Sequence, residues 1–575
     1  MNNKLISKLF LERNRFVLIG LTGRTGSGCS TAANILEMKS PAFPLYEDAI
    51  YEGLNLYEGL SKQRYNIVKK YAEENWEQFY SIKVSDLISA YLLTLSVEDM
   101  SKFILGSYKG LTIPKNEIDD LLNTGVFKNN YIEKKFTAFQ NYILNHSSEK
   151  STIDKSDNFI RYLKLVRKFT NDFKNELNKL RNDLYISTYQ IAGLSIRKLG
   201  RVDINYDNFE FSPDSVFHLP ETINRIIKVI RAIKERAFIV IDAIRNPYEA
   251  RFFKDRYSAF YLISINAPPK DRSEYLKNTR KFNVDQLEEL DRTESGDNKI
   301  SHQEFIGQNV KKCIEISDIH LFNPRNESDN HNILKSQLAW YFSLMLHPGL
   351  ITPTPMERIM QFAYTAKTNS GCISRQVGAV ITDSNYSVKA IGWNDVPKGQ
   401  YPCSLRSVDG LLNAFDPIIY SEYERNNKNF RDVATTKFKD ILITKEDLGG
   451  RNLAYCFKDV KNSVEPKVKN QVHTRSLHAE ENAFLQIVKH GGQAIEGGKL
   501  FTTASPCELC AKKAYQLGIK EIVYIDPYPG IARDHILSVG SKPPTLIQFR
   551  GAVGKGYHQL YEPTLPYKDE LEYFL

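Results

Sequence analysis

The feature that most constrains the fold of this chain is a set of four residues in its C-terminal part. His478 and Glu480 form a His-x-Glu pair, and Cys507 and Cys510 form a Cys-x-x-Cys pair with a proline directly before it. One histidine and two cysteines are ligand types that zinc takes in a hydrolytic site, where a fourth position stays open. The fold must therefore bring the two segments together, and the flanking sequence predicts a β-α-β-α-β arrangement around them.

The two pairs have different expected roles. Pro506, in the first turn of a helix, leaves backbone N–H groups free to face the thiols, and the helix dipole favours the metal-binding thiolates. Glu480 lies near enough to act on the metal's water without ligating the ion. A Cys-x-x-Cys alone leaves open a structural zinc or two buried cysteines. The upstream His-x-Glu favours a catalytic zinc held by His478, Cys507 and Cys510, with Glu480 as the catalytic residue.

A second motif lies near the N-terminus, where residues 16–31 (FVLIGLTGRTGSGCST) read as strand, glycine-rich turn and helix. Gly23 and Gly28 have the spacing of a Walker A loop, whose backbone N–H groups hold phosphate. Ser30 stands where the Mg²⁺-coordinating hydroxyl belongs, but Cys29 replaces the lysine that places positive charge on the phosphates. We therefore predict a P-loop that binds a nucleotide with Mg²⁺ and transfers phosphate poorly, the alternative being a plain glycine turn. The predicted nucleotide-binding residues are Gly23, Gly26, Gly28, Cys29, Ser30, Thr31, Asp242 and Arg245.

Chain length and the pattern of predicted strands and helices indicate an α/β protein of two domains. At 575 residues the chain is too long for one hydrophobic core. Strand-and-helix patterns at both ends flank a mostly helical, charged insertion over about residues 45–235, and a polar stretch at 323–332 reads as a linker. We predict one domain over residues 1–335, which contains the helical insertion, and a second over residues 336–575.

Composition and charge narrow the class of protein. A hydrophobic share of 42% and a charged share of 25% are ordinary for a globular chain that buries cores. The net charge of +9 suits phosphate-bearing partners but is too small to indicate nucleic-acid binding by itself. Seven cysteines, an odd number, do not fit a disulfide framework and favour a reducing compartment. Without a signal-peptide pattern or a bilayer-spanning run, we expect a cytoplasmic protein with no membrane partner.

Four stretches together resemble the deoxycytidylate deaminase family. They are CISRQVGAVITD (372–383), AIGWNDVPKG (390–399), HAEENA (478–483) and SPCELC (505–510). The order H-x-E…P-C-x-x-C is a signature of zinc-dependent nucleobase deaminases. The resemblance implies an α/β/α cytidine-deaminase-like fold, a Zn²⁺ cofactor and hydrolytic deamination of free dCMP or dCTP, with the choice between the two left open.

The resemblance also implies roles for residues around the site. Asn394 would contact the nucleotide, although an asparagine that only shapes a turn is the alternative. Asp395 departs from the glycine of the family's loop and places a carboxylate where phosphate binding is expected. Some members carry a second zinc, for which Cys372, Cys403 and His473 are the matching set; a small core residue is the alternative for Cys372.

Over its full length the chain resembles bacterial antiphage deaminases of the AvcD/DcdV type, in which an N-terminal P-loop nucleotide-kinase-like domain precedes the deaminase. That resemblance implies a regulatory nucleotide at the P-loop and depletion of deoxycytidine nucleotides during infection. Some members of that group are held inactive by a partner RNA, so an inhibitory RNA is a possible partner. The resemblance to deoxycytidylate deaminases implies a homo-oligomer.

Two other functions compete with this one. A nucleic-acid editing deaminase acting on single-stranded RNA or DNA needs a basic, aromatic-rich groove near the zinc, and no concentrated basic run lies beside His478 or Cys507. A nucleotide kinase with a sensor deaminase domain needs the missing Walker lysine, which Cys29 replaces.

Overall fold

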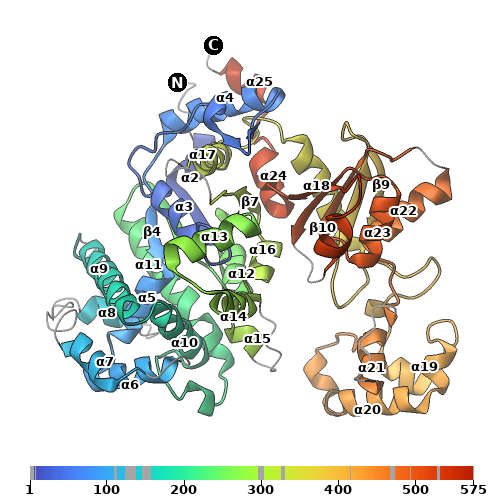
Figure 1. The fold of residues 1–575 in the computed structure, drawn as a ribbon, viewed down its shortest axis with the longest axis horizontal. Coiled ribbons are helices and arrows are strands. Elements are labelled where there is room, and N and C mark those ends of the chain that lie inside the picture. The colour runs from blue at the N-terminus through green and yellow to red at the C-terminus, as the bar shows by residue number, and fades with distance from the viewer. Residues whose placement is uncertain are drawn as a thin grey trace. The chain divides into compact units, whose positions relative to one another are not determined.

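The computed structural model divides the chain into two compact units (Figure 1). The first comprises Met1–Thr352 and Lys555–Leu575, and the second comprises Pro353–Gly554. The structure describes residues 6, 8–108, 113–123, 137–144, 157–295, 303–325, 331–414, 416–465, 473–491, 494–526 and 531–573. Across these ranges no helix has the length and apolar character needed to cross a membrane.

The first unit is built on a parallel sheet. Five of its strands follow the order β7-β6-β1-β5-β4. Their bounds are β1 Phe16–Thr22, β4 Tyr80–Lys83, β5 Ala237–Asp242, β6 Phe260–Asn266 and β7 Ile319–Phe322. Strand β1 pairs with β5 on one side and β6 on the other, and all seven of its residues are buried. This central position is why the segment reads as a continuous apolar run rather than an alternating one.

Helices of the first unit surround this sheet and form a second core beside it. Their bounds are α3 Cys29–Leu36, α4 Leu60–Asn75, α5 Val84–Leu92, α6 Val97–Ser107, α7 Lys115–Leu121, α8 Thr137–Leu144, α9 Asp157–Leu180, α10 Leu184–Leu199, α11 His218–Ile233, α12 Pro247–Arg256, α13 Pro269–Arg280, α14 Val284–Ser295, α15 Gln303–Ile306 and α16 Val310–Glu315. The second core packs α5, α6, α9 and α10 through buried residues such as Phe103, Phe169 and Phe173. The region 45–235, predicted as a mostly helical insertion, also contains β4, which pairs with β5 in the sheet.

Helix α17 (Asn332–Leu346) explains where the first unit ends. It packs against α4, and nearly all of its residues are buried, so it belongs with the first unit rather than with the second. The structure therefore divides the chain after Thr352, whereas the sequence predicted a boundary at residue 335. The chain also returns to the first unit from Lys555. Of the predicted linker at 323–332, residues 326–330 lie outside the described residues.

The second unit is a three-layer α/β/α arrangement. Its sheet has the order β12-β11-β10-β8-β9, with β10, β11 and β12 parallel and β8 antiparallel to both neighbours. The strands are β8 Gly378–Thr382, β9 Val388–Trp393, β10 Lys499–Ala504, β11 Glu521–Asp526 and β12 Thr545–Gln548, and the helices beside them are α18 Pro355–Ala366, α22 Ala479–His490 and α23 Glu508–Gln516. Helix α18 packs on one face of the sheet, and α22 and α23 pack on the other.

An insertion after β9 folds around a small core of its own. Its helices are α19 Glu422–Asn426, α20 Lys428–Ile443 and α21 Phe457–Val464. Val408, Phe430, Tyr455 and Val460 are among the buried residues of this core. Figure 1 shows these helices in orange, grouped together and separate from the sheet of the second unit.

Candidate active site

The predicted metal ligands meet at the starts of two helices. His478 is the residue directly before α22, and Cys507 is the residue directly before α23. The Nδ1 atom of His478 lies 3.3 Å from Sγ of Cys507 and 3.5 Å from Sγ of Cys510. Among the described residues, these three form the only group of three or more His, Cys, Asp or Glu side chains whose ligand atoms all lie within 4.8 Å of one another. One nitrogen and two sulfurs at this spacing fit a zinc ion with an open fourth position.

Electrostatics at these residues agree with a metal site. Hydrogen bonding from Cys510 and from His478 outweighs burial and lowers the pKa of Cys507 to about 3, which favours the thiolate form. The proximity of Cys507 and burial both raise the pKa of Cys510 far above its ordinary value. Two thiols this close cannot both ionise easily without a cation between them, which is what a bound zinc provides.

Glu480 is the second residue of α22, and 4% of its surface is exposed. Burial raises its pKa above the ordinary value. The hydroxyl of Thr502, on β10, donates to the Glu480 carboxylate at 3.4 Å. A buried carboxyl beside a metal site can accept a proton and return it, because burial weakens its preference for the charged form.

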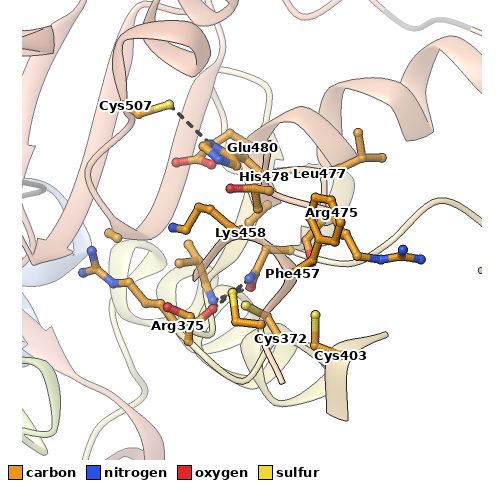
Figure 2. Close-up of a pocket in the computed structure, with 18 of the residues that line it drawn as sticks. Cys372, Arg375, Cys403, Phe457, Lys458, Arg475, Leu477, His478, Glu480 and Cys507 are labelled. Carbon is orange, nitrogen blue, oxygen red and sulfur yellow. Dashed lines mark hydrogen bonds between the residues drawn. The ribbon is translucent and has the colours of Figure 1, made fainter. Parts of the chain in front are cut away.

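A cavity of about 270 Å³ opens onto these residues (Figure 2). His478, Glu480 and Cys507 lie on one side of it, and the insertion contributes Cys456, Phe457 and Lys458 to its lining. Its described cationic side chains are Arg375, Lys458 and Arg475, with His478 in addition. These insertion residues could not be predicted as part of the site, because the insertion carries no recognisable motif.

Asn394 lines the same cavity, but the oxygen and the nitrogen of its side-chain amide both form hydrogen bonds with the backbone. Its Oδ1 accepts from the N–H of Val377 at 2.7 Å, and its Nδ2 donates to the carbonyl of Arg375 at 2.8 Å. The side chain thus fixes the loop that carries Arg375, which agrees with the turn-shaping alternative. Asp395 pairs with Leu477 through the backbone and accepts a hydrogen bond from Trp393.

The structure does not assemble the predicted second zinc set. Cys372 and Cys403 line the same cavity, as Figure 2 shows, but the ligand atoms of Cys372, Cys403 and His473 do not all come within 4.8 Å of one another. Cys456, from the insertion, is a third cysteine of this wall. Its pKa and that of Cys403 are both raised, mainly by burial.

The P-loop of the first unit runs from the end of β1 into α3. Gly28 precedes α3 with φ of 109°, a left-handed conformation that favours glycine. A Cβ on Gly28 would lie 2.1 Å from Nδ2 of Asn323, which donates to the carbonyl of Ser27 at 2.6 Å. Burial and the nearby Asp242 carboxylate raise the pKa of Cys29 to about 12, so its thiol is neutral where the lysine of a Walker loop would be charged.

An internal carboxylate occupies this loop. Glu294, at the end of α14 and 2% exposed, accepts hydrogen bonds from the backbone N–H of Thr25 at 3.0 Å and from the Thr25 hydroxyl. Arg245 pairs with the same carboxylate and donates to the Thr25 hydroxyl at 3.0 Å. Arg272 donates to the Thr25 carbonyl at 2.7 Å. Sequence reasoning placed Arg245 at the loop but missed Glu294, whose charge has no local pattern to mark it.

Further cations lie near the loop. Burial, Arg280 and Lys83 together lower the pKa of Lys174. Lys83, the last residue of β4, also acts on Asp242, whose pKa is raised because burial outweighs that cation. The Ser30 hydroxyl acts in the opposite direction to burial and lowers the pKa of Asp242. Arg325 stacks on Tyr275, 3.9 Å from the ring centre, and donates to the hydroxyl of Thr31 at 3.4 Å.

Comparison with known proteins concerns the second unit. Residues 353–526 match the family model described as the cytidine and deoxycytidylate deaminase zinc-binding region. The deoxycytidylate deaminases of Enterobacteria phages T2 and T4 are each 31% identical over 172 residues, which is 30% of this chain and 79% and 77% of those proteins. The solved structure of dCMP deaminase from the cyanophage S-TIM5 in complex with dCMP and dUMP is 22% identical, with a TM-score of 0.21 over 35% of this chain and 99% of that chain. The range matched by the family model contains His478, Glu480, Cys507 and Cys510.

Proposed function

The chain belongs to the deoxycytidylate deaminase family through its second unit, and on that premise we propose that it hydrolyses the amino group from free deoxycytidine nucleotides, dCMP or dCTP. The observation that carries the proposal is the group His478, Cys507 and Cys510 together with the buried Glu480. His478, Glu480 and Cys507 line one cavity. These residues fit zinc, which supplies Lewis acidity at its open position when bound.

In this proposal Glu480 moves the protons. Its carboxylate accepts a proton from the attacking water and delivers protons to N3 of the cytosine and to the leaving amine. Burial holds its pKa above the ordinary value, which suits a group that must both take up and release a proton. The starts of α22 and α23 fix His478 and Cys507, so the ligand set is held by the backbone of two packed helices.

Product identification by mass spectrometry tests this function. Purified protein is offered dCMP, dCTP, CTP and single-stranded DNA in parallel, with ammonia release measured alongside. We expect dUMP from dCMP or dUTP from dCTP. Comparing the rates with dCMP and dCTP shows whether the enzyme prefers the monophosphate or the triphosphate. Product from the oligonucleotide alone would assign the protein to the editing class instead.

For the first unit we propose a regulatory nucleotide site at the P-loop. Support comes from the order strand β1, glycine loop and α3, and from the cations that surround it. Lys83 is close enough to Asp242 to influence its charge, and we infer that it supplies part of the positive charge that Cys29 lacks. Because Glu294 already bonds the loop as an anion would, a phosphate group, with or without Mg²⁺, must exchange with this carboxylate.

Calorimetric titration with Mg²⁺–ATP and with pyrophosphate tests that exchange. Both Glu294→Ala and Glu294→Gln remove the competing charge, and we expect their affinity for these anions to rise about tenfold or more, the scale of one charge-assisted hydrogen bond. Glu288→Gln, an exposed residue on the same helix, is the matched control. Equal affinity in all four proteins would refute the exchange with Glu294, and no binding by any of them would show that the loop is not an anion site.

We also propose, on the family resemblance, that the deaminase depletes deoxycytidine nucleotides during phage infection. An inhibitory RNA and a homo-oligomeric assembly are part of this proposal. Phage yield in cells that express wild-type protein or Glu480→Ala tests it. Equal protection by the two proteins would separate any defence role from deamination.

A further inference from the structure

The insertion supplies one wall of the active-site cavity. Phe457 and Lys458 are the first two residues of α21, and both line the cavity that also contains His478, Glu480 and Cys507. This wall comes from a segment with its own buried core. The insertion therefore contributes side chains to the site itself rather than only covering it.

The three long cationic side chains of the cavity differ in their partners. Arg375 pairs with Asp526, whose carboxylate is almost fully buried. Arg475 lies 3.3 Å from the Glu424 carboxylate. Lys458 has no ion-pair partner anywhere in the described ranges, although it is partly buried. In Figure 2 its amine is directed to the same side of the cavity as the Arg375 guanidinium.

An unpaired, partly buried ammonium is costly unless a ligand neutralises it. Glu480 is the one carboxylate among the described lining residues, and its task at the zinc site leaves Lys458 without a counter-charge. A deoxycytidine nucleotide brings a 5′-phosphate with it, so the missing anion is part of the substrate. The charge pattern suits a nucleotide better than an unphosphorylated nucleoside.

A buried network fixes the residues that precede Lys458. The hydroxyl of Tyr455 donates to Glu424 at 2.7 Å, and Arg406 donates to the Tyr455 hydroxyl at 2.7 Å and pairs with Glu424. Arg406 and Glu424 are both 0% exposed. Because Arg475 also pairs with Glu424, the network connects the insertion to the segment directly before His478. Lys458 is thus presented by a rigid support, as specific recognition requires.

We propose that Lys458 binds the 5′-phosphate of the substrate and makes the enzyme select nucleotides over nucleosides, an inference that rests on the deaminase function proposed above. Phe457 forms the apolar part of the same wall and packs against the sugar or base. The insertion is then the specificity element of this deaminase.

Steady-state kinetics of Lys458→Gln with dCMP and with deoxycytidine tests the proposal. We expect kcat/KM for dCMP to fall about tenfold to a hundredfold, mainly through KM, because one charge-assisted contact is lost. Activity on deoxycytidine should stay within about twofold of wild type, and Lys458→Arg should retain most of the selectivity. Lys439→Gln, an exposed lysine on α20, is the matched control and should behave as wild type.

The outcomes separate this proposal from the function it rests on. Equal losses for dCMP and deoxycytidine, or an unchanged KM for dCMP, would overturn the role of Lys458 while leaving the deaminase intact. If wild-type protein converts neither substrate, the proposed function fails, and calorimetric binding of dCMP and deoxycytidine to wild type and Lys458→Gln still decides the phosphate contact. A selective loss of dCMP binding would support it, and equal binding would refute it.

Discussion

Replacing Glu424 by glutamine should increase local unfolding of the insertion without unfolding the rest of the chain. The substitution keeps the shape of the side chain and an acceptor for Tyr455, but it removes the charge that faces Arg406. Arg406 is fully buried, and its Nε and Nη1 atoms have no hydrogen-bond partner in the described part of the structure. The substitution therefore leaves a buried cation with little compensation.

The expected cost is large relative to the stability of the insertion. Removing one partner of a buried ion pair costs about 3–5 kcal/mol. A folded segment of roughly 60 residues has a free energy of unfolding of about 3–9 kcal/mol at the usual stability per residue. Local opening should therefore become roughly a hundredfold to several thousandfold more frequent, since each 1.4 kcal/mol is about a factor of ten.

Hydrogen–deuterium exchange measured by mass spectrometry detects this opening. We expect faster exchange in α20 and α21, unchanged exchange in β10 and α22, and a raised KM for dCMP because Lys458 loses its support. Glu446→Gln, an exposed residue of the same insertion, is the control. Unchanged exchange in α20 and α21 would refute the argument, as would an equal increase over the whole chain.

Two further predictions concern the metal site and pH. Glu480→Gln should keep its zinc and lower kcat by about 10²–10⁴-fold, the usual contribution of a general acid–base, whereas Cys507→Ala should lose zinc and activity together. Metal analysis and ammonia release, measured on the same samples, distinguish these results. Normal turnover by Glu480→Gln would contradict the role assigned to Glu480. Burial raises the pKa of Glu424, but the hydrogen bond and charge of Arg406 outweigh it and hold the pKa below its ordinary 4.5. The stability from this group is thus present above pH 4.5 and lost as the pH falls through the lowered value. Pepsin should cut the wild-type insertion faster as the pH drops below that range, whereas Glu424→Gln, already open, should show little pH dependence.

The zinc set is the part of the site that the sequence predicted most directly. His478, Cys507 and Cys510 meet as expected, because each stands at or near a helix start, where local turn chemistry fixes the direction of the side chain. The family expectation is confirmed at the level of deoxycytidylate deaminases. The roles of the individual residues remain predictions for the kinetic tests.

Most of the sheet was also predictable, since its central strands are long apolar runs. Strand β4 was missed because four residues within a helical region carry too little pattern, and its strand character comes from pairing with β5. The boundary after residue 335 was misplaced for a related reason. Helix α17 is mostly apolar and is buried nearly all round, so the sequence indicates burial but not which core the helix joins.

By itself, the sequence determined the ligand types, their spacing and the strand–loop–helix order around Gly23 and Gly28, because these features act over a few neighbouring residues. Only the tertiary structure decided that Glu294 bonds to the P-loop, that the Asn394 amide bonds to the backbone, and that Lys458 lines the same cavity as His478 and Cys507. Each of these depends on contacts between different elements of the fold, and the contact of Glu294 with Thr25 joins residues 269 positions apart. Packing of whole elements sets such contacts, and no local pattern of residues encodes them.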